Sequence, residues 1–372
     1  MSAQDTTSSR VVLTMPSTYT LTAVEWPEVT SGDDLVALTG DGADLRDGDI
    51  AVLTSKVVSK AEGRLVHGER TEAIAAETRR VVARRGSSVI AETRLGLVMA
   101  AAGVDASNTP AGTALLLPHD PDESARRLRQ DVYATSGRNV GVVITDTAGR
   151  AWRMGQTDLA VGCAGLPALH DLDGTLDTHG NRLLVTAAAV ADELAAAADL
   201  VKGKTTGRPL AIARGFAGFV LPPGEHGPGA ASLVRPAADD LFGLGAREAV
   251  AAATLRDDPD ALDHFPVRTA TETAPFRRLL DGWLHDLPAE RRRHVQVALT
   301  PDDCPSSPDS ATWVLRIAVR KDAEPGLLIA TGRLVERAET LAAGWRLSAH
   351  AHDLPAPNLG WRSVAQICWQ DH

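Results

Sequence analysis

The chain has 372 residues, of which 44% are hydrophobic, and its formal net charge is −10 at pH 7. This length accommodates one large domain and a smaller one, and the apolar content excludes global disorder. The acidic balance argues against a general nucleic-acid binder, because such a protein needs a basic face to neutralise phosphates. The three cysteines are widely spaced and form no CxxC pair, which predicts neither a disulfide framework nor a zinc site.

The N-terminal segment is polar, so we expect no signal peptide. The longest apolar stretch, residues 183–201, contains Asp192, Glu193 and Asp199. Three acids would make a membrane-crossing helix very costly. We therefore predict a cytoplasmic protein with neither a membrane nor a nucleic acid as its partner.

Predicted strands and helices alternate after a flexible tail at residues 1–10. Apolar and β-branched runs predict strands at residues 11–24, 50–54, 114–117, 140–145 and 209–213. Helical spacing or alanine richness predicts helices at residues 70–85, 122–131 and 186–202. Residues 221–229 are mostly proline and glycine, which predicts a loop. The alternation indicates a mixed α/β domain over residues 11–245.

The composition changes beyond that domain. Residues 254–309 are rich in Asp, Pro and Arg, and their apolar runs are modest. A strand is predicted at residues 313–319 and a helix at residues 332–345. We expect a second, smaller α+β domain over residues 246–372.

Residues 198–205 (ADLVKGKT) nearly match a phosphate-binding loop, with alanine in place of its first glycine. Such a loop needs a strand before it and a helix after it, so that the helix N-terminus faces the phosphate. Here the predicted helix comes first and a strand follows. We instead expect a helix end capped by Gly203, with Lys202 and Lys204 near its negative pole.

Asp105 lies in a turn-forming stretch that follows the apolar residues 97–102. An acid that emerges from a buried segment into a tight turn is a suitable metal ligand. An aspartate that merely caps its own turn is the commoner case, so the local pattern leaves both interpretations open.

Asp146 directly follows the predicted strand at residues 140–145, and ligand sites of α/β sheets gather at such strand ends. Thr147 adds a hydroxyl, and Arg150 and Arg153 follow within a few residues. These groups are typical of a magnesium–phosphate site with cationic clamps. An Asp-Thr turn with solvated arginines is the alternative.

A second set of polar residues follows the predicted strand at residues 50–54. Ser55 supplies a hydroxyl, and Lys56 and Lys60 supply ammonium groups. Such groups at a strand end can hold phosphate oxygens. A solvated helix start is the alternative.

Together these patterns resemble one family, the F420-0:gamma-glutamyl ligases, and most closely the N-terminal ligase half of a bifunctional actinobacterial enzyme. The matching stretches occur in family order and cover roughly residues 20–245. They are residues 45–50 (LRDGDI), 54–64 (TSKVVSKAEGR), 92–98 (ETRLGLV), 100–108 (AAAGVDASN), 145–153 (TDTAGRAWR), 155–158 (GQTD), 190–193 (VADE) and 235–242 (RPAADDLF).

The resemblance implies an α+β, or mixed α/β, ligase fold that forms an intertwined homodimer. It also implies that GTP is held without the usual phosphate loop and that Mg²⁺ or Mn²⁺ takes part, with K⁺ as a candidate further ion. By resemblance, Asp105 and Asp146 hold a divalent cation, Thr147 assists a second one, and other residues match nucleotide-contacting positions. These positions are Trp26, Pro27, Glu28, Ser55, Lys60 and Asn108.

The implied reaction joins coenzyme F420-0 and L-glutamate in two steps. The acid substrate's carboxylate attacks the γ-phosphate of GTP, and the glutamate amine then displaces phosphate from the acyl phosphate. Activation is needed because a carboxylate oxyanion is a very poor leaving group. Phosphoryl transfer requires cations around the moving group. From their charge alone, we assign Arg150 and Arg153 as clamps.

Two departures from the family pattern bear on this interpretation. The usual Gly-Leu-Pro or Gly-Ile-Pro near the start is Glu25-Trp26-Pro27 here, which places a bulky and a charged side chain beside the expected nucleotide pocket. The fused relatives carry a flavin-binding reductase, whereas residues 246–372 are short for such a domain. We therefore predict no flavin and no intact nitroreductase domain.

Two further hypotheses remain beside the glutamate ligase. One is a paralogous ligase that joins a different acid and amine in specialised metabolism. The other is a nucleotide-binding relative without catalytic activity.

Overall fold

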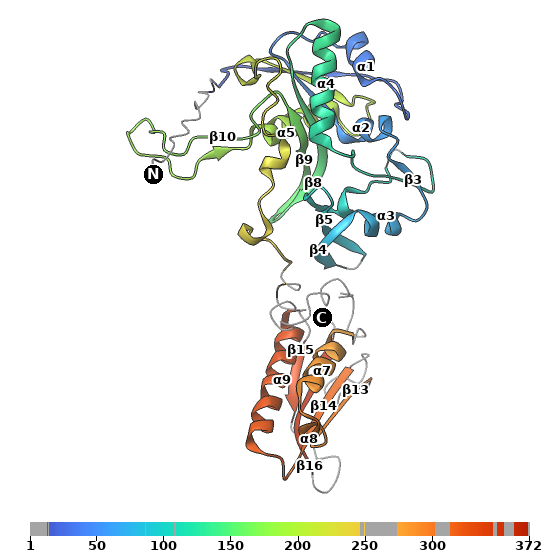
Figure 1. Cartoon of the computed structure of the whole chain (residues 1–372), viewed down its shortest axis with the longest axis vertical. Helices are drawn as coiled ribbons and strands as arrows, with labels where there is room; N and C mark the ends of the chain where they lie inside the picture. Colours follow the sequence, from blue (N-terminus) through green and yellow to red (C-terminus); the bar gives the residue numbers. More distant parts are fainter. Residues whose placement is uncertain are drawn as a thin grey trace, which may run out of the picture. The chain divides into compact units, whose positions relative to one another are not determined.

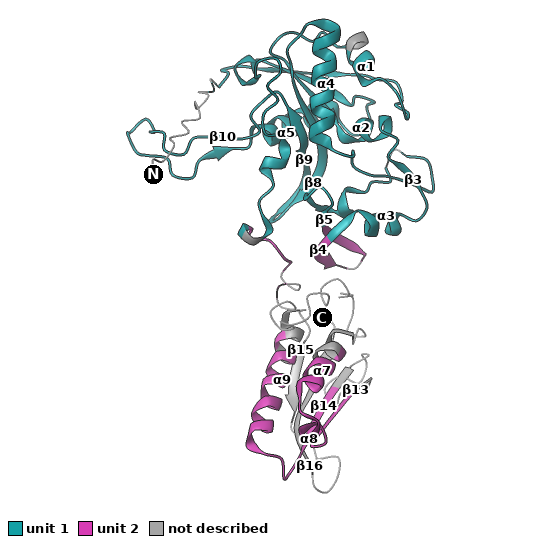
Figure 2. Ribbon diagram, in the orientation of Figure 1, with its two compact units in different colours: residues 1–79, 92–239 teal, residues 80–91, 240–372 magenta. Residues whose placement is uncertain are grey.

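The structure is a computed structural model of the chain (Figure 1). It describes residues 13, 15–85, 87–107, 109–245, 249, 274–301, 313–344, 348–352 and 361–370. Contacts divide the chain into two compact units (Figure 2): unit 1 comprises residues 1–79 and 92–239, and unit 2 comprises residues 80–91 and 240–372. Each unit is described separately, and the predicted boundary near residue 245 stays a prediction.

Unit 1 is built on a five-stranded sheet in the order β1-β12-β2-β8-β9. All neighbouring pairs are antiparallel except β2 and β8, which run parallel with Thr54 opposite Thr145. Because these two strands run the same way, β2 ends beside the middle of β8, and β8 continues beyond that point toward the same edge of the sheet. The strands are β1 (Thr20–Val24), β2 (Ile50–Thr54), β8 (Gly141–Arg150), β9 (Arg153–Ala164) and β12 (Leu210–Arg214).

Both faces of this sheet are covered, so its central strands are almost continuously apolar. On β2, Ile50 and Val52 pack into one core with helix α5 (Val190–Lys202), whereas Ala51 and Leu53 pack into the other. The second core includes residues of α2 (Ser55–Ala61) and α4 (Pro121–Ser136). Unit 1 is thus a helix–sheet–helix sandwich, which agrees with the mixed α/β class predicted (Figure 1).

The helix ends in unit 1 are set by recognisable caps. Asp120 accepts a hydrogen bond from the Glu123 N–H at 3.0 Å, and Gly137 ends α4 in the left-handed conformation. Gly203 ends α5 with φ of 65°, and its N–H bonds to the Asp199 carbonyl. The predicted helix end at Gly203 is therefore confirmed.

The remaining elements of unit 1 are short. A helix α1 precedes β2, and a small pair β3-β7 flanks α3. A two-stranded arm, β10-β11, projects from the body of unit 1 in Figure 1. Their bounds are α1 (Leu35–Gly42), β3 (Leu65–His67), α3 (Arg70–Glu77), β7 (Thr113–Leu115), β10 (His170–Asp171) and β11 (Ala187–Ala188).

Several predicted boundaries are wrong. The helix predicted at residues 70–85 ends at Glu77, and Thr78 begins strand β4 (Thr78–Arg85), which pairs with β5 (Ser88–Thr93) and through it with β6 (Val98–Ala100). Val81 and Val82 are buried there, and sheet neighbours override the helical spacing. The helix predicted from residue 186 starts at Val190, because Ala187 and Ala188 pair with β10.

Unit 2 includes a four-stranded antiparallel sheet in the order β13-β14-β16-β15. Leu315 and Ile317 of β14 and Leu327 and Leu334 of α9 are buried in its core. The predicted strand and helix of this region are present with different bounds. The elements are α7 (Ala274–Asp286), α8 (Ala289–Arg292), β13 (Val295–Pro301), β14 (Trp313–Arg320), α9 (Pro325–Gly344), β15 (Ser348–His352) and β16 (Trp361–Gln370).

Among the helices that the structure describes, none has both the length and the apolar character needed to cross a bilayer.

Candidate active site

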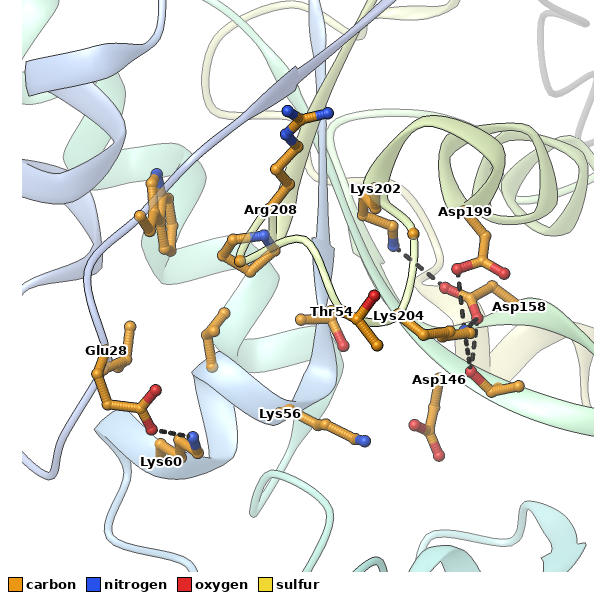
Figure 3. A pocket seen from close by; sticks show the side chains of 18 of the residues that line it. Glu28, Thr54, Lys56, Lys60, Asp146, Asp158, Asp199, Lys202, Lys204 and Arg208 are labelled. Atoms are coloured by element: carbon orange, nitrogen blue, oxygen red, sulfur yellow. Dashed lines mark hydrogen bonds and ion pairs between the residues drawn. The ribbon is translucent and has the colours of Figure 1, made fainter. Parts of the chain in front are cut away.

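A cavity of about 290 Å³ opens where β2 ends beside Thr145 of β8 (Figure 3). Its walls come from the segment before α1, from α2, from β8 and β9, and from the loop between α5 and β12. Those segments are far apart in the chain, and the parallel pairing of β2 with β8 brings them to one edge. This is the position at which open α/β sheets bind ligands.

Asp146 lines this cavity from β8. Its carboxylate accepts a hydrogen bond from the Ser55 hydroxyl at 3.1 Å, and Ser55 is buried at the start of α2. Burial raises the pKa of Asp146 to about 6, although Ser55, the Thr147 N–H and the charge of Lys56 act in the opposite direction. The structure thus brings together two predicted site residues, and the ionised carboxylate would gain from a nearby cation.

Asp105 is held by Lys56. The Lys56 ammonium lies 2.6 Å from the Asp105 carboxylate and also donates to the Ser107 hydroxyl at 2.7 Å. Burial alone would raise the pKa of Asp105, but the hydrogen bonds from Lys56 and Ser107 lower it. Figure 3 shows Lys56 and Asp146 entering the same space, whereas Asp105 does not line the cavity. A cation shared by Asp105 and Asp146 stays a prediction; in this structure Lys56 pairs with Asp105, and its charge lowers the pKa of Asp146.

Four of the predicted nucleotide-contacting residues line the wall opposite Asp146. Trp26, Pro27 and Glu28 border the cavity, and Lys60 pairs with the Glu28 carboxylate on the same wall (Figure 3). Trp26 is buried, and its indole N–H has no hydrogen-bond partner among the described residues. Asn108, the other predicted contact, lies outside the described residues.

Asp158, which no sequence pattern marked as a site residue, also lines the cavity. Asp158 of β9 lies opposite Thr147 of β8, and its carboxylate binds the ammonium groups of Lys202 and Lys204, each at 3.1 Å. Asp158 stands in the GQTD stretch noted above, but nothing local indicates that its partners come from the end of α5. Residues 198–205, which resemble a phosphate-binding loop, lie at the end of a helix instead of after a strand, yet part of this segment lines the cavity.

The cavity is nearly neutral although many charges line it. Each of its five cationic side chains is already paired with a carboxylate. Two of these carboxylates, those of Glu25 and Asp105, lie outside the cavity wall. Glu25 binds Arg208 at 3.0 Å, so the acid that precedes Trp26 holds a cation of the cavity. The cations are Lys56, Lys60, Lys202, Lys204 and Arg208.

Arg150 and Arg153 lie at the β8–β9 turn and do not line the cavity. The strand predicted to end at residue 145 continues to Arg150, which carries both arginines away from Asp146 along the hairpin. Arg153 is exposed, and one Arg150 nitrogen is buried without a partner in the part of the chain that is described. Their assignment as clamps stays a prediction.

No group of three or more His, Cys, Asp or Glu side chains is arranged as a metal site in the described ranges. The oxygen ligands nevertheless suit Mg²⁺ or Mn²⁺, because Asp146 and Thr147 present hard donors at a cavity wall. Among the described side chains, Ser55 donates one hydrogen bond to the Asp146 carboxylate. Most lone pairs of that carboxylate therefore have no side-chain donor in the described structure. The residues therefore fit a divalent cation that brings further oxygen ligands with its substrate.

Comparison with known proteins decides the family. The family model described as F420-0:Gamma-glutamyl ligase matches residues 23–76 and 67–215. The chain belongs to this ligase family. The matched residues include every described wall of the cavity, from Trp26 to Pro209.

Individual relatives give the same result. A protein of Methanopyrus kandleri named Coenzyme F420:L-glutamate ligase is 41% identical over 210 residues, which cover 51% of this chain and 83% of the relative. Proteins of the same name are 44% identical over 216 residues in Halobacterium salinarum (51% and 84%) and 40% identical over 243 residues in Methanothermobacter thermautotrophicus (58% and 95%). These matches leave a large part of the chain beyond the shared region.

Proposed function

We propose that this chain adds L-glutamate to coenzyme F420-0, with GTP as the phosphoryl donor. The observation that carries the proposal is the 40–44% identity to ligases of that name over 83–95% of their length. The cavity supports it, since it lies at the sheet edge where ligands of such folds bind and is lined by five cations suited to phosphate.

The proposed chemistry needs an activated carboxylate. The acid substrate's carboxylate oxygen bonds to the γ-phosphorus of GTP and the bond to GDP breaks, which gives an acyl phosphate. The glutamate amine then bonds to the acyl carbon, phosphate leaves, and the amine loses a proton. Lys56, Lys60, Lys202 and Lys204 would neutralise phosphate charge through these steps.

Asp146, Thr147 and Asp105 would hold Mg²⁺ or Mn²⁺, which would supply charge stabilisation at the transferred phosphoryl group. The near-neutral cavity supports this part of the proposal. A triphosphate would bring several negative charges into a site whose cations are already paired, so further positive charge has to accompany it.

The proposal extends to the assembly. We infer a cytoplasmic homodimer, with K⁺ as a candidate further ion and no flavin bound by residues 246–372. The β8–β9 turn supports a dimer, because Trp152 and Met154 are 88% and 98% exposed there and a second copy would cover them.

The test is a reconstituted reaction. Purified protein is incubated with GTP, Mn²⁺ or Mg²⁺, L-glutamate and F420-0, and phosphate release and the glutamyl product are measured by colorimetry and mass spectrometry. Asp146→Asn should lose both, because an amide is a neutral and poorer ligand for the cation. Asp192→Asn, which changes an acid of α5 that does not line the cavity, should retain both. Absence of phosphate release with every acid tested would refute the proposal.

A second candidate is a ligase for another acid and amine. The Glu25–Arg208 pair favours it, because it places a charged pair at the cavity where the family pattern has glycine. Phosphate release with a different acid and none with F420-0 would support this alternative.

A further inference from the structure

The Asp158 carboxylate is the most densely bonded acid of the cavity. One oxygen accepts from the Thr145 hydroxyl at 2.8 Å and from Lys202 at 3.1 Å. The other accepts from the Thr147 hydroxyl at 2.8 Å and from Lys204 at 3.1 Å. Two cations and two hydroxyls from β8 and the end of α5 therefore converge on one side chain of β9.

Such a cluster is expensive to bury. The side chains of Asp158 and Lys202 are 4% and 3% exposed, and taking an ion pair out of water usually costs more than its attraction returns. Burial alone would raise the pKa of Asp158, but the charge of Lys202 and the two threonine hydroxyls lower it. At Lys202 burial prevails and lowers the pKa, although Asp158 opposes it. A pair of apolar side chains would stabilise the contact between β9 and the end of α5 at a lower desolvation cost. The buried Asp158–Lys202 pair therefore calls for a functional explanation.

The position of the cluster supplies that reason. Asp158, Lys202 and Lys204 all line the cavity, and Lys204 is 58% exposed toward it. Lys202 also donates to the Thr145 hydroxyl at 2.8 Å, and Lys204 donates to Thr147 and Asp199. The two ammonium groups are thus oriented before any ligand enters, which lowers the entropic cost of binding an anion.

We propose that Asp158 is a positioning residue: it holds Lys202 and Lys204 as paired, oriented cations that together bind the polyphosphate of the nucleotide. This inference rests on the proposed nucleotide site and specifies which residues prepare it. The ligand class is a linear polyphosphate, because two ammonium groups that share one carboxylate match two neighbouring phosphate groups.

The consequence of losing Asp158 follows from the groups around Lys202. In the described structure its charged neighbours are Asp158, Asp199 and Lys204, and Asp146 lies near Asp158 on β8. Without Asp158 the buried ammonium keeps only Asp199 as a counter-charge and faces Lys204. It should therefore lose its proton at lower pH, so that anion binding weakens as the pH rises.

The experiment measures binding of tripolyphosphate in saturating Mg²⁺, without nucleoside, by calorimetry at pH 6 and pH 8.5. For Asp158→Asn, the ratio of the dissociation constant at pH 8.5 to that at pH 6 should exceed the wild-type ratio about tenfold, the effect of losing one charge-assisted contact. Titration of the probe itself cancels in this comparison. Asp192→Asn, a matched substitution outside the cavity, should show the wild-type ratio.

A double variant separates positioning from folding. Asp158→Asn with Lys202→Met removes both members of the buried pair and leaves no unpaired charge, so it should fold even where the single variant does not. We expect it to bind tripolyphosphate at least about tenfold more weakly than wild type at pH 6, without the added pH dependence.

Wild-type affinity in the double variant, or a wild-type pH ratio in a folded Asp158→Asn protein, would overturn the inference. Failure of tripolyphosphate to bind the wild-type protein would also overturn it. Failure of the reaction with F420-0 and glutamate, with the binding pattern intact, would instead refute the proposed function and leave the role of Asp158 standing.

Discussion

The Asp146→Asn substitution should stabilise the free protein while it removes metal-dependent activity. Burial raises the pKa of Asp146 from 3.8 to about 6, so the folded protein binds a proton at this site more tightly than the unfolded chain does. Because folding raises the pKa of this acid, the free energy of unfolding falls as the pH rises from 3.8 to about 6. A shift of this size corresponds to about 3 kcal/mol above pH 6.

Solvent screening reduces that figure, because Asp146 borders the cavity and is only half-buried. We therefore expect Asp146→Asn to raise the free energy of unfolding by roughly 1–3 kcal/mol at pH 8 and by about half as much at pH 5. Urea unfolding at the two pH values measures this difference. Equal stability gains at pH 5 and pH 8, or undiminished Mn²⁺ binding by the variant, would refute the reasoning.

The control is Asp192→Asn. Burial raises the pKa of Asp192 as well, and its carboxylate accepts only the Ala160 N–H among the contacts described. This variant should share the direction of the stability change but keep Mn²⁺ and nucleotide affinity. If both variants gain stability and only Asp146→Asn loses Mn²⁺ binding, then Asp146 destabilises the free protein and is needed for its ligand.

Three further outcomes are expected. Glu25→Gly frees Arg208 from its carboxylate and should tighten GTP binding about threefold at low salt, with the gain disappearing at high salt in a calorimetric titration. Lys56→Met removes the cation that pairs with Asp105 and should tighten Mn²⁺ binding severalfold in the absence of nucleotide, as measured by electron paramagnetic resonance. Arg129→Met leaves several backbone carbonyls without their donor and should lower stability by about 3 kcal/mol or more in urea unfolding, without changing nucleotide affinity.

The elements best predicted from the sequence were those whose local pattern matched their final environment. Strand β2 was predicted with its observed bounds, because a fully buried run is delimited by a turn before Ile50 and a helix start at Ser55. The same reasoning placed Asp146 one residue beyond a strand end; β8 continues past it, yet Asp146 lies beside the end of β2, and it lines the cavity there. The polar residues that directly follow the buried runs of two parallel strands thus indicate a ligand-binding edge from the sequence alone.

The errors came from interactions that no local pattern contains. The arginine-rich residues 78–85 have helical spacing, yet pairing with β5 makes them a strand. Asp158 shows no local sign of its role, because Thr147 is its cross-strand neighbour and Lys202 reaches it from 44 residues away. Only the arrangement of β8, β9 and the end of α5 turns these residues into one cluster.

Charge pairing connects these findings to the proposed reaction. In the free protein, carboxylates outside the cavity wall pair with two of its cations: Asp105 pairs with Lys56, and Glu25 pairs with Arg208. A polyphosphate that enters must either share those two cations with the carboxylates or displace the carboxylates, and both are unfavourable unless positive charge enters as well. A divalent cation at Asp146 would supply that charge at the acid whose ionised form is least stabilised in the free protein. Nucleotide and metal should therefore bind with positive coupling, each tightening the other by the same factor.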